Sequence, residues 1–349
     1  MFEFRHQPLK TLYFIYTCFT ILFIRVPYWT VKSRIVPRPR PSWGVGRQVV
    51  IHTIRAGTAA LFKTSFPRPV SLEEASKSAD KLGFEWVEPT PELIVGDIRE
   101  FAKINSVEAT RTGGFWYGRK GSEGKLGCKA EPGERVLYYL HGGGHIVIAS
   151  AHPSDIAVPS LAGALLQHCP TISRIFALEY RLSSAEPFEP SGAFPAAIID
   201  IVAGYTVLLI SPTVDWAITH TGPESSMVRN KDTDYCGNFF EGYTVRALLG
   251  KMPPGDIGTN AYMSPGSLRI ANTDGMFKGF PPTCIVVGEG EIAYDSNVTF
   301  RDRMMADLGR DKVTWIESYG ATHDFVNLPW FEPERTNALK EIGAWMNTI

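Results

Sequence analysis

The chain has 349 residues, of which 44% are hydrophobic, and 35 Lys and Arg stand against 36 Asp and Glu for a net charge of −1. This length and apolar content fit one large α/β domain with appendages. The balanced charge gives a nucleic-acid partner no electrostatic support. The five cysteines are widely spaced and odd in number, so they predict neither a disulfide framework nor a zinc site built on thiols.

The first element is an uncharged, strongly apolar segment, Thr11–Ile24, with basic residues on both sides. Its fourteen residues would reach about 21 Å as a helix, less than the roughly 30 Å hydrocarbon core of a bilayer. Extension to Trp29 supplies the missing length if the Arg25 side chain reaches the headgroups. We therefore predict a membrane anchor within residues 1–32, with a buried helix or a signal peptide as the alternatives.

The next residues predict a linker followed by helices. Residues 33–44 are rich in Pro and Arg and predict an extended linker that leaves the bilayer. Residues 45–108 are predicted to be helical, with amphipathic runs over Gly46–Phe62 and Thr90–Ile104 and a helix N-cap at Ser71.

From residue 135 onward, β-type runs alternate with helical ones, which is typical of an α/β fold with a mostly parallel sheet. The predicted strands are Val136–Leu140, Arg174–Glu179, Leu208–Val214, Thr283–Val287 and Lys312–Glu317. A closing helix is predicted over Pro333–Asn347.

A glycine run follows the first of these strands, in the order His141, Gly142, Gly143 and Gly144, with His145 next. Consecutive glycines after an apolar strand let bare backbone N–H groups approach a substrate oxygen. The run therefore predicts an oxyanion hole, although on its own it would also fit a turn or a phosphate-binding nest. The two histidines flank glycines rather than sharing a helix face, so they do not predict a metal site.

Four blocks in order extend this interpretation; they are YYLHGGGH (138–145), LEYRLSSAEPF with FPAAIIDIVAGY (178–205), LLISPTVDW (208–216), and VVGEGEIAYDS with YGATHDF (286–325). In these blocks the chain resembles the hormone-sensitive-lipase branch, or fold-3 family, of the α/β-hydrolases, particularly fungal membrane-anchored esterases and sterol-deacetylase-like proteins. The resemblance implies an α/β-hydrolase fold, an N-terminal helical cap and cleavage of carboxylic esters through an acyl-enzyme, without a cofactor or metal.

The resemblance also implies roles for single residues. His323 matches the general base of the family, and Glu291 matches the acid that orients it, with Asp295 as the alternative orienter. The run from His141 to Gly144 matches the oxyanion hole. A small-molecule ester, a lipid or a sterol ester is the implied substrate, and a membrane is the implied site of residence, with the endoplasmic reticulum as one candidate compartment.

The sequence departs from the family at the nucleophile, because it contains no Gly-x-Ser-x-Gly. Residues Phe194–Leu209 are predicted to be helical, yet they run directly into the next strand with no Gly, Pro, Asn or Asp between Tyr205 and Ser211. A strand with its crossover helix takes about 30 residues. We therefore predict that the central elbow strand and its helix are missing near Thr206–Ile210.

No other serine replaces the missing one. Ser122, Ser211 and Ser264 lack the small neighbours of a nucleophile elbow and are predicted to be turn or loop serines. An exon omitted from the coding sequence and a true pseudohydrolase both explain the loss, so ester hydrolysis and a non-catalytic lipid-binding or regulatory role remain alternatives. The predicted hydrolase domain is 45–349, with a cap built from 45–108 and part of 222–280.

Overall fold

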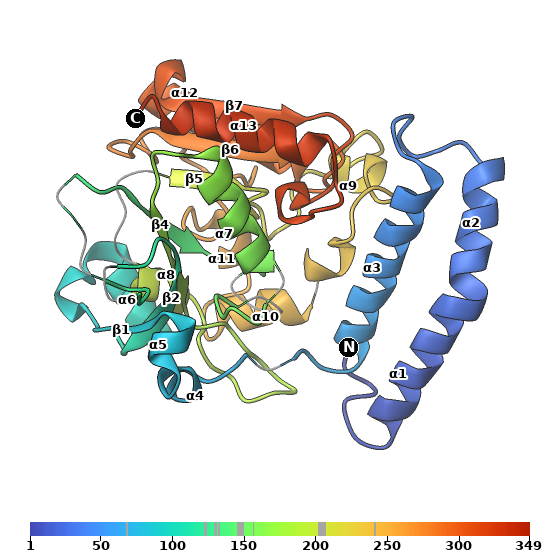
Figure 1. Cartoon of the computed structure of the whole chain (residues 1–349), viewed down its shortest axis with the longest axis horizontal. Helices are drawn as coiled ribbons and strands as arrows, with labels where there is room; N and C mark the ends of the chain where they lie inside the picture. Colours follow the sequence, from blue (N-terminus) through green and yellow to red (C-terminus); the bar gives the residue numbers. More distant parts are fainter. Residues whose placement is uncertain are drawn as a thin grey trace.

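The structure is a computed structural model of the whole chain, and it describes every residue except 68, 122–123, 129–130, 132, 145–149, 156, 202–206 and 241. Figure 1 shows an α/β body with a group of long N-terminal helices along one side. The body has the mixed α/β architecture that the sequence predicts.

The strands form two sheets, with the orders β1-β2-β4-β3 and β5-β6-β7. Pairs β1–β2 and β2–β4 are antiparallel, whereas β3–β4, β5–β6 and β6–β7 are parallel. The strands are β1 (Phe84–Val87), β2 (Thr112–Gly118), β3 (Val136–Leu140), β4 (Arg174–Glu179), β5 (Val207–Ile210), β6 (Thr283–Gly288) and β7 (Val313–Ser318).

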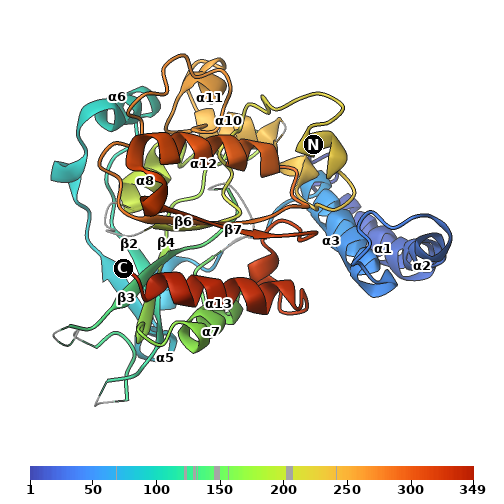
Figure 2. The same cartoon turned by 90° about the horizontal axis from the view of Figure 1, so that it is seen from above.

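Helices cover both faces of the sheets, and Figure 2 shows α12 and α8 on one side with α13 and α7 on the other. Strand β6 shows why both faces are covered, because its successive apolar side chains point to opposite faces of the sheet. Cys284 and Val286 pack toward α7 and α13, whereas Ile285 and Val287 pack toward α12. These helices are α7 (Ala157–His168), α8 (Ala196–Ile201), α12 (Tyr294–Leu308) and α13 (Glu334–Met346).

The two sheets separate between β3 and β5, where the elbow strand is predicted to be missing. Within the described residues, no strand pairs with the open sides of β3 and β5. Every residue of β6 is buried, while β3 carries one exposed and four half-buried residues. Parallel strands are normally covered on both faces, so β3 lacks a neighbour that its position would ordinarily have.

The N-terminal apolar segment forms one continuous helical stretch, Leu9–Ile35, made of α1 (Leu9–Thr20), η1 (Ile21–Arg25) and α2 (Val26–Ile35). Only 11% of its most apolar window is buried, which excludes the buried-helix alternative. The next helix, α3 (Val45–Lys63), agrees with the predicted amphipathic run.

The prediction of an extended linker over 33–44 is wrong at both ends. Helix α2 continues to Ile35, and Trp43 is fully buried. The Trp43 indole Nε1–H donates a hydrogen bond to the carbonyl of Gly320 at 2.7 Å, and its ring packs edge-on against Phe331. Burial of a large aromatic ring whose N–H is hydrogen-bonded stabilises the protein, and this stabilisation holds the segment against the body instead of leaving it free in solvent.

The prediction that residues 45–108 are entirely helical is also wrong, because β1 lies within them. Phe84 of β1 is buried and contacts the ring of Phe115 on β2 with centroids 5.4 Å apart, while Glu85 points outward. This alternation favours a strand once β2 supplies a pairing edge. Ser71 caps α4 as predicted, accepting a hydrogen bond from the Glu74 N–H at 3.2 Å.

The helix predicted over Phe194–Leu209 and the strand predicted to reach Val214 are both shorter. Helix α8 is Ala196–Ile201, residues 202–206 lie outside the described residues, and residues 207–210 already form β5. Strand β5 ends at Ile210 because Ser211 has a φ of +44° and Pro212 lacks an N–H.

Short helices over the carboxyl ends of the strands bury a second apolar cluster, which includes Phe2, Phe62, Phe194 and Trp216. The remaining helices are α4 (Leu72–Ser76), α5 (Ala79–Leu82), η2 (Pro91–Leu93), α6 (Gly96–Asn105), α9 (Ser226–Arg229), η3 (Gly237–Phe240), α10 (Tyr243–Leu249), α11 (Asp256–Thr259), η4 (Arg310–Lys312) and η5 (Phe325–Asn327).

The open strand edges predict low stability. Each buried backbone group without a partner costs about 1–3 kcal/mol, against a total of about 5–15 kcal/mol for a domain. In hydrogen exchange, the amides of β3 and β5 on the open sides should exchange much faster than those of β6, and thermal unfolding should fall below the usual range of about 45–65 °C. Equal protection in all three strands, with cooperative unfolding inside that range, would contradict the sheet gap.

Candidate active site

Two loops at the carboxyl ends of neighbouring parallel strands bring the predicted acid and base together. The loop after β6 carries Glu291, and the loop after β7 carries His323. The Gly290 N–H donates a hydrogen bond to the carbonyl of Ala321 at 2.8 Å. A Cβ at Gly288 or Gly290 would lie 2.3 Å or 2.7 Å from that oxygen. Only glycine therefore allows the two loops to approach this closely.

Glu291 is fully buried and is held by three groups. Its Oε1 accepts hydrogen bonds from the Ser211 hydroxyl and from the Gly288 N–H, both at 2.6 Å. Its Oε2 lies 3.4 Å from His323 Nδ1. The last distance is longer than an ordinary N–H···O bond, but the carboxylate faces the ring nitrogen that an orienting acid would face.

Asp295 does not take this position. Its Oδ2 accepts a hydrogen bond from the Ser226 N–H at 2.7 Å, and its Oδ1 lies 3.4 Å from the Arg229 guanidinium. Asp295 thus binds α9, and the geometry favours Glu291 over Asp295 as the partner of His323. The longer glutamate reaches the imidazole without disturbing the loop contact.

The other contacts of His323 come from residues with no sequence signal for this position. The Cys236 thiol is one of the groups near the imidazole that raise its pKa. The Asp324 Oδ2 lies 3.8 Å from His323 Nε2, and the ring of Tyr235 stands edge-on with centroids 6.0 Å apart. A cysteine in an irregular insertion carries no motif, so sequence reasoning could not have placed it here.

The charges around His323 set its protonation. Burial lowers the pKa of His323, but the nearby Cys236 and the Asp324 and Glu291 carboxylates outweigh burial and hold the pKa well above its usual value. Burial raises the pKa of the Glu291 carboxyl, and its bonds to His323, Ser211 and Gly288 oppose that rise.

Ser211 connects the strand β5 to both loops. Its N–H donates to the carbonyl of Val286 at 2.8 Å, and its Oγ accepts a hydrogen bond from the Asp324 N–H at 2.9 Å while donating to Glu291. The predicted turn serine is therefore also a positioning residue for Glu291. Ser264 donates to the carbonyl of Ile257 and accepts from the Trp216 N–H, and Ser122 lies outside the described residues.

The glycine bend lies beside the base loop. Gly143 and Gly144 have φ values of +96° and +58°, and a Cβ at Gly142 would lie 3.6 Å from Asp324 Oδ2. A Cβ at Gly144 would lie 2.6 Å from the ring of Trp216. The bend therefore requires glycine both for its backbone conformation and for its packing.

His141 anchors the start of the bend. Its ring stacks on Tyr180 with centroids 4.2 Å apart, and the Tyr180 hydroxyl donates to the His141 carbonyl at 2.5 Å. Its Nε2 lies 3.8 Å from an oxygen of Glu179, whose pKa burial raises to about 7. His141 is thus a structural support for the bend, and His145 lies outside the described residues.

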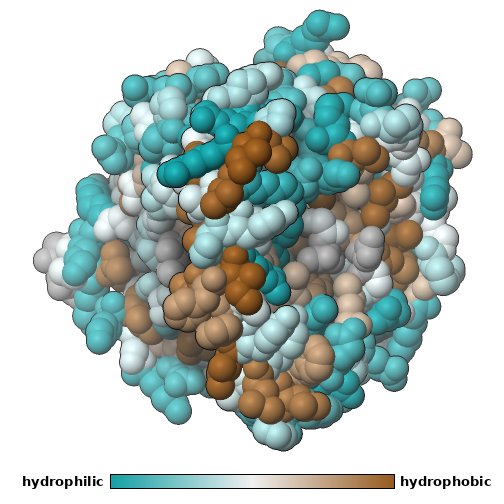
Figure 3. Space-filling model, turned by 90° about the vertical axis from the view of Figure 1, so that its right-hand side faces the viewer, coloured by the Kyte–Doolittle hydropathy of each residue, from teal (hydrophilic) through white to brown (hydrophobic). Residues whose placement is uncertain are grey.

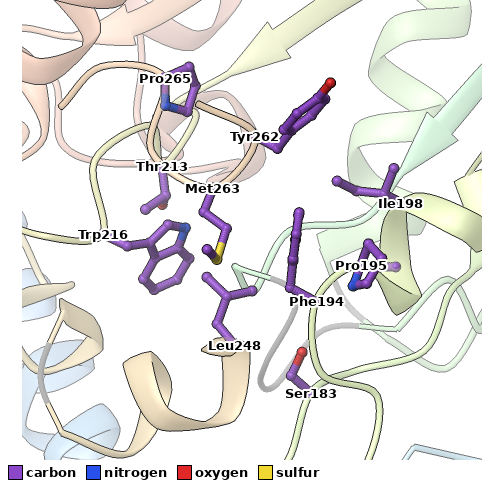
Figure 4. A pocket seen from close by; sticks show the side chains of 11 residues that line it. Ser183, Phe194, Pro195, Ile198, Thr213, Trp216, Leu248, Tyr262, Met263 and Pro265 are labelled. Carbon is purple, nitrogen blue, oxygen red and sulfur yellow. The ribbon is translucent and has the colours of Figure 1, made fainter. Parts of the chain in front are cut away.

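An apolar cavity has a volume of about 130 Å³, and Figure 4 shows the side chains that line it. Trp216 lines the cavity and also packs against Gly144, so it connects the cavity to the glycine bend. Around it, Phe194, Leu248, Met263 and other apolar side chains converge (Figure 4). The volume is small compared with the roughly 300–1,000 Å³ of ordinary ligand pockets.

The segment between the N-terminal helices and the body braces the acid and base loops. Arg40 Nη2 donates to Glu289 Oε1 at 2.9 Å and to Asn230 Oδ1 at 2.8 Å. Asn230 in turn donates to the carbonyl of Glu291 at 2.7 Å, and Glu289 Oε2 accepts the Gly320 N–H at 3.2 Å. None of these residues was predicted to contribute to the site.

No family model and no curated protein matches the chain. Solved structures do match. An esterase/lipase from an uncultured bacterium has a TM-score of 0.52 and 18% identity over 88% of this chain and 99% of its own. EstE5 soaked with p-nitrophenyl butyrate has a TM-score of 0.54 and 20% identity over the same shares. A hormone-sensitive lipase from a metagenome library has a TM-score of 0.51 and 16% identity over 93% and 97%.

These likenesses show the fold. The chain has the α/β-hydrolase fold that these esterases and lipases share, as the sequence predicts. At identities of 16–20% the comparison does not carry over the chemistry, so the roles of single residues depend on the geometry of the site.

The position of Glu291 predicts that its carboxylate, and not that of Asp295, helps to set the pKa of His323. Replacing Glu291 with Gln removes a carboxylate from the imidazole and should lower the pKa of His323, measured by NMR titration of the histidine ring signals. The matched variant Asp295→Asn should leave that titration unchanged. A shift in the Asp295 variant without one in the Glu291 variant would show that the orienter is wrongly assigned.

Proposed function

We propose that this chain is a carboxylic-ester hydrolase scaffold that keeps its acid–base pair and oxyanion bend but has lost the serine elbow, so that this form does not turn over esters through an acyl-serine. One observation carries the proposal: Glu291 and His323 face each other beside the glycine bend, next to the open edges of β3 and β5. In this fold the elbow strand would occupy the space between those edges.

The geometry supports the ordinary division of work in a form that contains the serine. His323 would take the proton of the serine hydroxyl as it attacks the ester carbonyl, and Glu291 would stabilise the imidazolium that results. The N–H groups of Gly143 and Gly144 would stabilise the negative oxygen of the tetrahedral intermediate. His323 would then give its proton to the leaving alcohol, and water would release the acid from the acyl-enzyme.

The surroundings of the bend suggest the substrate class. The cavity walls are apolar and the volume is small, which suits a short acyl group on a lipid or sterol alcohol. The short helices within 45–108 and 222–280 would form the cap that excludes water from this group. On this basis we divide the chain into an anchor (1–32), a connecting segment (33–44) and a hydrolase domain with its cap (45–349).

The N-terminal stretch Leu9–Ile35 supports attachment to a membrane. It is long and apolar enough to cross a bilayer, and only 11% of its most apolar window is buried. A membrane enzyme acting on lipid esters would meet its substrate at the bilayer surface, and the endoplasmic reticulum is one such location.

A second candidate function is lipid binding without catalysis. The apolar cavity beside Trp216 is formed without the missing segment, so it could hold an acyl chain that is never cleaved. Filling the cavity distinguishes this function, because Ala197→Trp should abolish binding of a fluorescent short-chain lipid, whereas Ala271→Trp on the surface should not.

A serine-reactive fluorophosphonate probe tests the main proposal. The chain should not be labelled above the level of its His323→Ala variant, because no hydroxyl is activated by the imidazole. A form that carries a Gly-x-Ser-x-Gly strand and helix inserted near Thr206 should be labelled, and labelling should depend on His323. Strong His323-dependent labelling of the chain as it stands would refute the loss of the nucleophile.

A further inference from the structure

The N-terminal apolar helix is joined to the α/β body at both of its ends. Just before it, Phe2 is fully buried among the rings of Phe62 and Phe66, and its N–H donates to the carbonyl of Phe62 at 2.8 Å. Just after it, Trp43 is fully buried and bonded to Gly320. Both ends therefore pack into the same folded body, Phe2 in the cluster with Phe62 and Trp43 in the main apolar core.

Between its ends, the apolar helix runs antiparallel along α3 (Figures 1 and 2). The ring of Trp29 stacks on His52 with centroids 5.3 Å apart, and Lys10 Nζ donates to Ser65 Oγ at 2.6 Å. Helix α3 itself belongs to the body, because Ile51 is part of its main apolar core. A bilayer around the apolar helix would have to enclose α3 and the adjoining body as well.

A helix of 27 residues is about 40 Å long, more than the roughly 30 Å of a bilayer core. If it crossed the bilayer, its two ends would lie in different aqueous compartments. Phe2 and Trp43 could not then both occupy the same domain. The fold as a whole is therefore incompatible with a spanning orientation.

The faces of this helix are reversed relative to a helix that covers a protein core. Its buried positions are small and polar, namely Thr17, Thr20 and Ser33. Eleven of its large apolar side chains are more than half exposed, and they are Leu9, Leu12, Ile15, Tyr16, Phe19, Leu22, Phe23, Ile24, Tyr28, Val31 and Ile35. Tyr13, Phe14, Ile21 and Trp29 are half-buried. Figure 3, which views this side of the molecule, shows apolar side chains in a band bordered by hydrophilic ones.

The charges around the band indicate what covers it. Between Glu3 and Glu73 the sequence has no acidic residue, but it has eleven Lys and Arg. Arg40, Arg47 and Arg55 pair with carboxylates of the body, but Lys32, Arg34 and Arg38 are exposed at the end of the helix. A protein partner would need only apolar complementarity, whereas these exposed basic side chains complement the phosphates and carboxylates of anionic lipid headgroups. The apolar side chains would enter the upper part of the acyl region while the basic side chains stay among the headgroups.

We propose that Leu9–Ile35 binds side-on to one leaflet of an anionic bilayer and does not cross it. This inference rests on the membrane attachment proposed above and specifies its geometry. It places the carboxyl ends of the strands, the base loop and the cap on the same side of the membrane as both ends of the helix.

Attachment is tested first, by flotation of the full chain with vesicles of phosphatidylcholine alone or mixed with phosphatidylserine. Binding should be much stronger to the mixture and should weaken with salt. The double variant Ile15→Asp and Phe19→Asp should lose most of the binding, whereas Asn347→Asp, which adds a charge at an exposed site far from the band, should not. Failure to float with either vesicle would overturn the attachment itself.

Orientation is tested separately, with the full chain synthesised in the presence of sealed microsomes. In a background with Cys18→Ser and Cys128→Ser, which removes the two accessible thiols, the single variants Glu3→Cys and Arg38→Cys place a thiol at either end of the helix. A membrane-impermeant maleimide should label both thiols from outside without detergent. If one thiol reacts only after the membrane is dissolved, the helix crosses the bilayer and the side-on geometry is wrong, although the attachment and the proposed hydrolase scaffold would stand.

Discussion

The candidate site depends on the contact between the loops that follow β6 and β7. Gly290 donates to the carbonyl of Ala321, and a Cβ at Gly288 would lie 2.3 Å from that same oxygen. This backbone contact brings Glu291 to His323. Ser211, from the end of β5, then joins Glu291 to the base loop through its hydroxyl. Three neighbouring parallel strands are sufficient to build the acid–base pair, and none of them is the strand that would carry the nucleophile.

That separation would let the acid–base pair form in a chain without an elbow strand. The sheet β5-β6-β7 is a complete parallel unit covered by α12 and α13, so the acid–base pair does not need the missing strand. The glycine bend follows β3 on the other sheet, and its packing against Trp216 and Asp324 bridges the gap. The unpaired edges of β3 and β5 therefore lower the stability of the domain more than they change the geometry of Glu291 and His323.

The sequence predicted the α/β fold and most of the strands, because these depend on local periodicity and on motif order. It did not predict β1, whose strand conformation depends on pairing with β2, a partner distant in the sequence. Nor did it predict Arg40, Asn230 or Cys236 beside the acid and base loops, since their roles follow from long-range packing. The linker prediction failed for the same reason, because the burial of Trp43 depends on a distant loop.

The most direct test of the account is the intact mass of the full chain after incubation with p-nitrophenyl butyrate. The account predicts no butyryl adduct on a serine, because none of the described residues places a serine hydroxyl against the His323 imidazole beside the glycine bend. A stable or turning-over butyryl-serine that disappears in the His323→Ala variant would show that the chain retains a nucleophile, and it would contradict the central claim.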